Sequence, residues 1–450
     1  MKISLKRYLN KIFLLSNWKN FRPSQILTFA AMKAEILTIG DEILIGQTID
    51  TNSAWIAEQL YLIGIGTNRI VSISDTKKAI LEAIDDSFSR ADLIVMTGGL
   101  GPTQDDITKE TLTEYFQTEL ITNQEVLEGI TEFFSSRGKE MLEGNTLQAD
   151  LPKDAVILMN TRGTAMGMWF EKHGKVLISM PGVPYEMQGI MREYGLEKLK
   201  THFNPPVIIH RTVLTQGIGE SFLAEQISDW ETSLRNEGLS LAYLPSPGIV
   251  KLRISGFGAR GNEGAIKDRI DYYTEELECR ISPNIFGRDK ETMAGVVGLL
   301  LQKHGKTLST AESCTGGYLA HLITSVAGAS NYFLGSAVVY SNTSKVEILG
   351  VESKTLTAYG PVSEAVVKQM AEGARRRFGS TYALATTGVA GPESPYPEVS
   401  PGTIWLAIAG PNGTRASMHQ FGKSRSRNIT VSALTVLNWL RNEILTAELE

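Results

Sequence analysis

A serine placed directly before a turn with two glycines stands out among the residues that could do chemistry. Residues 310–317 read Thr-Ala-Glu-Ser-Cys-Thr-Gly-Gly, so Ser313 lies where a helix is expected to begin. A serine there can act as a nucleophile, with backbone N–H groups facing the oxygen that becomes negative in acyl transfer. Cys314 is a rival nucleophile, although a small buried role is commoner for cysteine. Taken alone, such a serine is more often a helix cap than a catalytic residue.

A serine nucleophile needs a base, and no histidine of the chain lies in a supporting motif. The candidate base is Lys345, which follows an expected strand and lies close in sequence to Tyr340. A lysine accepts a proton only when neutral, so burial or a neighbouring positive charge has to lower its pKa. Arg425 could supply that charge or bind a phosphate as a fork. Thr387 ends another expected strand and offers a hydroxyl group beside free N–H groups.

A second group of candidate residues lies in the first half of the chain. A glycine-rich loop, TGGLGPT (97–103), follows an apolar run, and glycines let backbone N–H groups approach an anion. Adjacent carboxylates could hold a hard metal ion beside a phosphate. The structural alternative is a tight turn followed by aspartates that cap a helix. We expect a phosphate and divalent-metal site formed by the loop residues Thr97, Gly98, Gly99 and Gly101 and by the carboxylates of Asp41, Asp105 and Asp106.

The elements that must position these residues follow from hydrophobic periodicity. In the first half, strands are expected at 34–40, 69–73 and 92–96, with helices at 51–63 and around 80–88. Alternating strands and helices with short links predict a doubly wound α/β domain. The ligand crevice of such a domain lies at the carboxyl ends of its strands, where both acidic and glycine-rich segments fall.

The second half predicts two further domains. Residues 207–214 and 249–254 alternate like half-exposed strands around a helical run, which indicates a small α+β domain. From about residue 291, strands and amphipathic helices alternate again. We therefore predict an α/β protein with two separate α/β domains joined by a small α+β domain. The expected segments are a basic, disordered extension at 1–31 and domains at 32–204, 205–288 and 289–450.

Composition narrows the possible functions. The chain of 450 residues has a formal charge of −5, which argues against a dominant nucleic-acid-binding surface. Its two cysteines exclude a disulfide framework, which favours a cytoplasmic protein, and its histidines lack zinc-ligand spacing. The first 31 residues are basic and contain no Asp or Glu, so we expect a disordered extension or a true start at Met32. No apolar run is long enough to span a membrane.

Two sets of motifs resemble a known family. GDEILIGQTIDTNSAWIAEQL, LIVMTGGLGPTQDDIT and PGVPYEM resemble the molybdopterin-binding fold at the start of CinA (competence/damage-inducible protein A) proteins. TAESCTGG, AVVYSNTSK and TTGVAGP are similar, in order and spacing, to the CinA C-terminal family. The resemblance covers residues 34–190 and 291–442, and the middle segment fits the small linking domain of full-length CinA.

The C-terminal resemblance implies hydrolysis of nicotinamide mononucleotide (NMN) to nicotinic acid mononucleotide and ammonia, without a metal. It implies that Ser313 is the nucleophile and that Tyr340 and Lys345 are its activating partners. The residues that would serve the substrate are Gly316, Gly317, Thr387 and Arg425. Two departures bear on substrate binding: the loop 393–400 has no glycine, and Lys-Ser-Arg replaces the usual Gly-Asp-Arg at 423–425.

The N-terminal resemblance implies ADP-ribose pyrophosphatase activity that needs a divalent metal. It does not determine whether the ligand of this domain is a pterin or ADP-ribose. The family suggests a homodimer that binds the small nucleotides NMN and ADP-ribose. We expect it to bind neither nucleic acid nor a membrane. The alternative is a non-catalytic nucleotide- or molybdopterin-binding protein of the competence or damage response.

Overall fold

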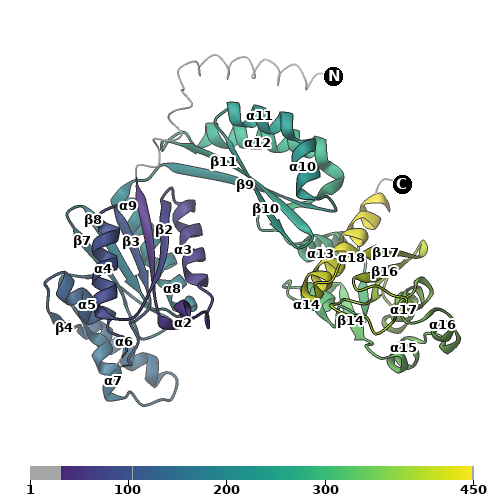
Figure 1. The fold of residues 1–450 in the computed structure, drawn as a ribbon, viewed down its shortest axis with the longest axis horizontal. Helices are drawn as coiled ribbons and strands as arrows, with labels where there is room; N and C mark the ends of the chain where they lie inside the picture. The colour runs from purple at the N-terminus through teal and green to yellow at the C-terminus, as the bar shows by residue number, and fades with distance from the viewer. Residues whose placement is uncertain (1–31, 104, 448–450) are drawn as a thin grey trace. The chain divides into compact units, whose positions relative to one another are not determined.

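The computed structural model describes residues 32–103 and 105–447, and Figure 1 shows their fold. The expected disorder of 1–31 lies outside the described residues. The chain forms two compact units. The first runs to Ile209 and takes in Gly256–Lys267, and the second comprises His210–Ser255 and the chain from Asp268 onward. The segment expected as one linking domain, 205–288, is therefore divided between the two units.

The N-terminal domain has the expected α/β architecture around a six-stranded sheet of order β2-β1-β3-β8-β7-β6. The strands are β1 (Lys33–Ile39), β2 (Gly66–Ile73), β3 (Leu93–Thr97), β6 (Val156–Leu158), β7 (Gly167–Lys172) and β8 (Lys175–Met180). β2, β1, β3 and β8 run parallel, whereas β7 and β6 add to the sheet antiparallel. The carboxyl ends of four neighbouring strands therefore meet at one edge.

Helices cover both faces of this sheet. The helices of the domain are α2 (Asp41–Leu44), α3 (Thr51–Leu62), α4 (Lys77–Phe88), α5 (Thr108–Tyr115), α6 (Gln124–Ser135), α7 (Glu143–Thr146), α8 (Pro184–Ile190) and α9 (Leu196–Phe203). Two short strands, β4 (Leu120–Thr122) and β5 (Asp150–Pro152), pair antiparallel apart from the main sheet. The side chains of β3 alternate between two cores: Leu93 and Val95 pack on the side of α3, Ile94 and Met96 on the side of α4. A strand buried on both faces reads as an unbroken apolar run, as it does here.

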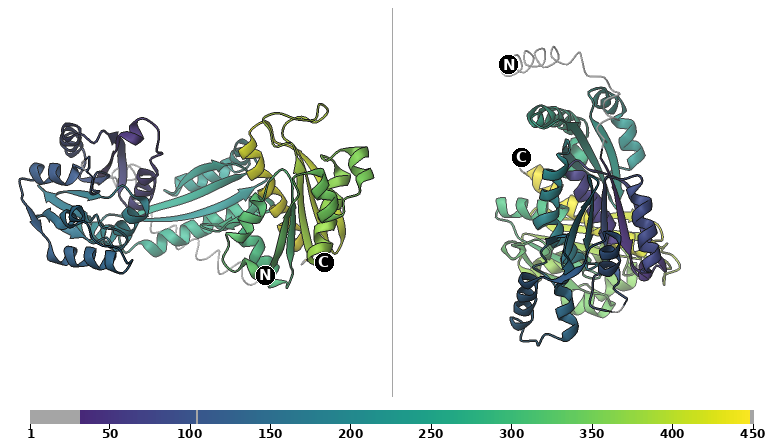
Figure 2. Two further views of the ribbon diagram at one scale, coloured as in Figure 1. Left: turned by 90° about the horizontal axis from the view of Figure 1, so that it is seen from below. Right: turned by 90° about the vertical axis from the view of Figure 1, so that its left-hand side faces the viewer.

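A four-stranded sheet follows, of order β10-β11-β9-β12. Its elements are β9 (Val207–Gln216), α10 (Glu220–Gln226), α11 (Ser228–Asn236), β10 (Ser240–Ser246), β11 (Ile249–Gly258), α12 (Glu263–Ile281) and β12 (Ile285–Arg288). The single helical run expected between β9 and β10 is two helices, because Ile227 (φ −110°) leaves helical geometry between them. The long teal strands of this sheet can be followed in the left view of Figure 2.

The C-terminal domain is built on a five-stranded sheet of order β14-β13-β15-β16-β17. The strands are β13 (Leu308–Glu312), β14 (Phe333–Val338), β15 (Tyr382–Gly388), β16 (Thr403–Gly410) and β17 (Gly413–Gln420), and the helices are α13 (Met293–Lys303), α14 (Tyr318–Thr324), α15 (Asn342–Leu349), α16 (Ser353–Tyr359), α17 (Glu364–Phe378) and α18 (Arg425–Ala447). β14, β13 and β15 are parallel, while β16 and β17 are antiparallel.

The two faces of the C-terminal sheet carry different side chains. One face presents large residues such as Leu308, Leu384 and Leu406 to α13, α14 and α18. The other presents alanines, among them Ala383 and Ala385, to α15 and α17. Small side chains let a helix approach a sheet closely, so α15 and α17 pack directly over the strands that lead to the candidate site. No helix of the described residues is both long and apolar enough to cross a membrane.

Candidate active site

Ser313 directly follows β13, at the carboxyl edge of the three parallel strands. Its backbone N–H donates to the carbonyl of Thr386 at 2.9 Å, which extends the pairing of β13 with β15 by one residue. The chain then turns: the N–H of Gly316 donates to the carbonyl of Ser313, and Gly316 and Gly317 take φ values of 60° and 99°. Left-handed φ values favour glycine. The serine therefore lies in a tight strand-to-helix turn.

Lys345 reaches this serine from the first turn of α15, which is capped by the side chain of Ser341. Its Nζ lies 3.2 Å from Oγ of Ser313 and donates to the carbonyl of Val339 at 3.0 Å. The lysine is only 2% exposed. Burial disfavours the charged ammonium and lowers the pKa of Lys345. The geometry thus places a lysine within reach of the serine's proton and favours its neutral form.

Cys314 is adjacent to the serine but in a different environment. Its side chain is 5% exposed, and burial raises the pKa of the thiol to about 12. The thiolate, not the thiol, is the nucleophile, so burial works against a nucleophilic role for this cysteine. The structure therefore favours Ser313 over Cys314.

Tyr340 and Arg425 form a pair of their own. Nη2 of Arg425 donates to Oη of Tyr340 at 2.8 Å, and Nη1 donates to the carbonyl of Gly391 at 3.3 Å. Tyr340 is 62% exposed, and no hydrogen bond within 32–103 and 105–447 joins it to Lys345 or Ser313. Tyr340 therefore contacts the guanidinium rather than the lysine. The pKa of Lys345 is lowered by burial, not by the charge of Arg425.

Thr387, near the end of β15, is buried and donates its hydroxyl to the carbonyl of Pro361 at 2.8 Å. This hydrogen bond ties Thr387 to the segment before α17 and not to the turn that carries Ser313. The preceding Thr386 makes the contact with the turn instead, since its Oγ1 lies 2.7 Å from Oγ1 of Thr315. Side chains alternate across a strand, which explains why two neighbouring threonines have different partners.

Two of the four backbone N–H groups of residues 314–317 already have acceptors in the structure. The N–H of Gly316 donates to the carbonyl of Ser313, and the N–H of Gly317 donates to a buried carboxylate. Within the described chain, the N–H groups of Cys314 and Thr315 donate to no other residue. These two are therefore the groups of the turn that remain free to meet a developing negative charge.

The buried carboxylate is that of Glu312, which the sequence interpretation did not single out. It is 0% exposed and accepts the N–H groups of Gly317 (3.0 Å), Leu319 (3.0 Å) and Ala320 (2.8 Å) at the start of α14. It, rather than Ser313, is the cap of that helix. An acidic residue ending an apolar strand just before a glycine turn and a helix was the available signal, because helix N-termini attract negative charge.

The N-terminal loop is held by close backbone contacts. The N–H of Gly98 donates to the carbonyl of Met180 at 3.0 Å, and a Cβ on Gly98 would lie 2.2 Å from the carbonyl oxygen of Ile39. Thr97 donates its hydroxyl to the carbonyl of Pro181 at 2.9 Å. The glycine is needed where three strand ends approach one another, so the loop's shape follows from packing.

Asp106 accepts hydrogen bonds within this loop. Its Oδ2 accepts the backbone N–H of Thr103 at 3.1 Å. A Cβ on residue 101 would lie 2.4 Å from the same carboxylate oxygen, so a glycine fits there. The carboxylate closes the turn that the glycines open, which is the structural alternative that the sequence left open.

Asp41 and Asp105 lie at the same edge as a residue that the sequence interpretation omitted, Asp75. Burial raises the pKa of Asp75, and the negative charges of Asp41, Asp105 and Glu42 raise it further. Yet nowhere in the described part of the chain do three His, Cys, Asp or Glu side chains converge closely enough to hold one metal ion. The predicted set of Asp41, Asp105 and Asp106 is therefore not assembled as a metal site.

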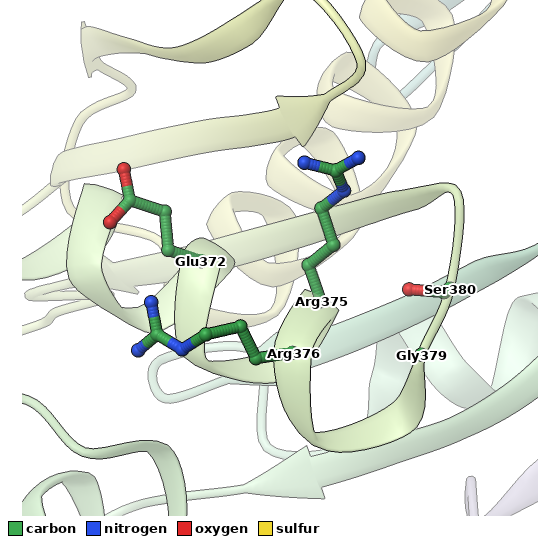
Figure 3. A pocket seen from close by; sticks show the side chains of 5 residues that line it. All are labelled: Glu372, Arg375, Arg376, Gly379 and Ser380. Carbon is green, nitrogen blue, oxygen red and sulfur yellow. The ribbon is translucent and has the colours of Figure 1, made fainter.

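A separate hollow of about 350 Å³ lies at the end of α17. It is lined by Glu372, Arg375, Arg376, Gly379 and Ser380, as Figure 3 shows. Ser380 precedes β15, whereas Thr386 lies toward the carboxyl end of β15 and pairs with Glu312, the residue before Ser313. The hollow therefore lies at the opposite edge of the sheet from Ser313. Arginines in the last turn of a helix stabilise the negative end of its dipole, which accounts for their presence without a ligand.

Three family models match the chain. The CinA C-terminal domain matches residues 290–444, a "Probable molybdopterin binding domain" matches 35–201, and the damage-inducible protein CinA KH domain matches 210–287. Together these segments contain all the candidate residues described above.

Several full-length proteins are similar to this chain. A CinA-like protein of Cytophaga hutchinsonii is 46% identical over 91% of this chain and 98% of its own length. A CinA-like protein of Flavobacterium psychrophilum is 44% identical over 92% of this chain and 99% of its own. Among solved structures, the protein CinA with unknown function from Thermoplasma acidophilum is 32% identical, with a TM-score of 0.34 over 37% of this chain and 96% of that one.

Proposed function

The chain belongs to the CinA family, and from that premise we propose that its C-terminal domain hydrolyses NMN to nicotinic acid mononucleotide and ammonia. The observation that carries the proposal is the 3.2 Å contact between Nζ of Lys345 and Oγ of Ser313 in a buried site. A buried lysine whose pKa is lowered can serve as a base at lower pH than a solvated one.

The residues support a two-step acyl transfer. Neutral Lys345 takes the proton of Ser313 while Oγ attacks the carboxamide carbon, and the N–H groups of Cys314 and Thr315 stabilise the oxyanion. The resulting ammonium of Lys345 returns the proton to the leaving nitrogen, so ammonia departs and an acyl ester of the serine remains. Water, deprotonated by the same lysine, then hydrolyses the ester and releases the acid and the free serine. No step uses a metal.

The pair of Arg425 and Tyr340 suits the phosphate of the nucleotide. A guanidinium offers two donors to phosphate oxygens, and here its orientation is set by Oη of Tyr340 and the carbonyl of Gly391. Gly391 is separated from the unusual loop 393–400 only by Pro392, so that loop borders the proposed phosphate subsite. We expect the altered loop to change the KM for NMN more than kcat.

Ammonia release from NMN by the purified protein tests the proposal. Ser313→Ala and Lys345→Met should abolish release, whereas the matched control Lys354→Met should retain it, because Lys354 is an exposed lysine outside the site. If Cys314→Ala stops ammonia release and Ser313→Ala does not, the nucleophile is assigned wrongly. If the native protein releases no ammonia, NMN is not its substrate.

ADP-ribose hydrolysis by the N-terminal domain is a second candidate. It is favoured by the acidic edge formed by Asp41, Glu42, Asp75 and Asp105, which repels a phosphate unless a cation balances it. Because no three carboxylates of this edge converge among the described residues, a cation would have to be held by one or two of them together with the phosphates of the substrate. AMP formation from ADP-ribose should appear with added Mg²⁺ or Mn²⁺ and be lost in Asp105→Asn. Ligand binding without turnover of either nucleotide would instead identify a non-catalytic nucleotide- or pterin-binding protein.

A further inference from the structure

Glu312 is an unusual residue for the end of a buried strand. Its carboxylate is 0% exposed, and no ion pair within the described residues balances its charge. Leaving a carboxylate unpaired in a protein interior is costly unless hydrogen-bond donors surround it. Five donors do so here: the backbone N–H groups of Gly317, Leu319 and Ala320 and the hydroxyls of Thr315 and Ser336.

The directions of the hydrogen bonds around this carboxylate follow from counting protons. An ionised carboxylate only accepts, so the single hydroxyl proton of Thr315 goes to Oε2 of Glu312 at 2.7 Å. The contact of 2.7 Å between Thr315 and Thr386 must then be donated by Thr386.

A second hydroxyl chain ends on the same carboxylate. Thr310 on β13 donates to Oγ of Ser336 on β14 at 2.7 Å, and Ser336 donates to Oε1 of Glu312 at 3.4 Å. Both chains therefore run one way, toward Glu312. They tie β14, β15 and the start of α14 to the residue that immediately precedes Ser313.

We propose that Glu312 is a positioning residue of the active site: its carboxylate fixes the turn that carries Ser313. This inference rests on the proposed amidase function. The three N–H groups that bind Glu312 hold the start of α14, while those of Cys314 and Thr315 stay free for the oxyanion. Glu312 touches neither substrate nor the reacting atoms, so it acts through the turn.

The decisive variant is Glu312→Gln, which keeps the shape but replaces one accepting oxygen with an NH₂ group. An NH₂ group facing N–H and O–H donors breaks at least one of the five contacts. We expect kcat for ammonia release to fall on the order of 100-fold with little change in KM, because small misplacement of a nucleophile has effects of this size. The pH dependence of kcat should keep its midpoint, since Lys345 is untouched.

Glu35→Gln is the matched control. Glu35 is also 0% exposed but lies in the N-terminal domain, where Nε and Nη2 of Arg90 donate to it at 3.1 and 3.2 Å. We expect this variant to lower the melting temperature of its own domain and leave the amidase kcat unchanged. A second pair of variants tests the hydrogen bond from Thr315 to Glu312. Thr315→Val, which removes the hydroxyl, should lower kcat, whereas Thr315→Ser, which keeps it, should retain kcat.

Labelling of Ser313 by a fluorophosphonate, followed by mass spectrometry, separates this inference from the proposed function. If the native protein hydrolyses no NMN but its serine is labelled, and Glu312→Gln loses that labelling, the positioning role stands and the substrate is wrong. If folded Glu312→Gln retains kcat and labelling within about twofold of the native protein, Glu312 is only a helix cap and the inference is overturned. Native protein that neither hydrolyses NMN nor is labelled would overturn both.

Discussion

Burial assigns opposite roles to the neighbouring groups around the serine turn. The same desolvation that lowers the pKa of Lys345, and so favours a base, raises the pKa of Cys314 and so suppresses a nucleophile. A charged form is disfavoured in both cases: the ammonium of the lysine and the thiolate of the cysteine. Burial in the same region therefore favours Ser313 with Lys345, and disfavours Cys314, as the source of the nucleophile.

The pH profile of ammonia release tests the state of Lys345. We expect kcat/KM to rise with pH through a midpoint below the ordinary lysine value, because the neutral amine is the active form. The lysine's contribution to stability has the same sign: it is present above the ordinary pKa and is lost as the pH falls through the lowered one. Lys345→Arg should be inactive at every pH, since a guanidinium does not deprotonate. A midpoint at or above the ordinary lysine value would show that the amine is not desolvated.

Alkylation distinguishes the two cysteines. Cys279 is exposed and Cys314 is buried with a raised thiol pKa, so iodoacetamide at mildly alkaline pH should modify Cys279 alone in the native protein. Unfolding in urea should expose both thiols, which serves as the internal control. Rapid native labelling of Cys314, read by peptide mass spectrometry, would contradict a buried thiol with a raised pKa.

At the scale of elements, the candidate site residues come from the end of one strand and the starts of two helices. Ser313 follows β13, Arg425 begins α18 and Lys345 lies in the first turn of α15. α17 packs over the same sheet face as α15, and its alanine and glycine residues let the two helices approach each other. The position of the lysine therefore depends on how closely α17 packs.

Two helical glycines make this dependence measurable. A Cβ on Gly373 of α17 would lie 2.0 Å from the carbonyl oxygen of Leu349, the last residue of α15, whereas a Cβ on Gly129 of α6 meets nothing within 4 Å. Gly373→Ala should destabilise the C-terminal domain by about 1–3 kcal/mol through overpacking and reduce amidase activity.

Gly129→Ala is the control for that change. In an open helical position the substitution should stabilise by about 0.4–1 kcal/mol, because the unfolded chain loses freedom. Urea titrations followed by circular dichroism would give both values. Equal effects of the two substitutions would mean that α17 does not pack against the end of α15 as described.

At the scale of the whole molecule, the two candidate chemistries lie in two different compact units. Their residues share no element, so each activity should survive loss of the other. Ser313→Ala should abolish ammonia release from NMN and leave metal-dependent AMP formation from ADP-ribose intact, whereas Asp105→Asn should do the reverse. Parallel assays of both substrates on both variants check this. Loss of both activities in either single variant would show that the two sites are coupled.

Much of the architecture is readable from the chain because buried strands leave an apolar run. The runs at 34–40, 92–96 and 403–409 correspond to β1, β3 and β16. β17 was not expected, since Gly413–Gln420 is half-exposed and polar on an edge, where pairing with β16 rather than burial makes the strand. The metal prediction for Asp41, Asp105 and Asp106 rests on their positions at strand ends, and a position in the chain does not determine where a side chain points.

The family, the α/β class and the identity of Ser313, Lys345 and Arg425 as candidates came from the sequence, because motif order and hydrophobic period are properties of the chain itself. Only the tertiary structure decided their partners: lysine with serine, tyrosine with arginine, and Asp106 with its own loop. It also decided the importance of Glu312, whose five donors come from two strands, a turn and a helix start. Burial and hydrogen-bond direction arise only when segments far apart in the chain meet, and these two quantities determine which groups can react.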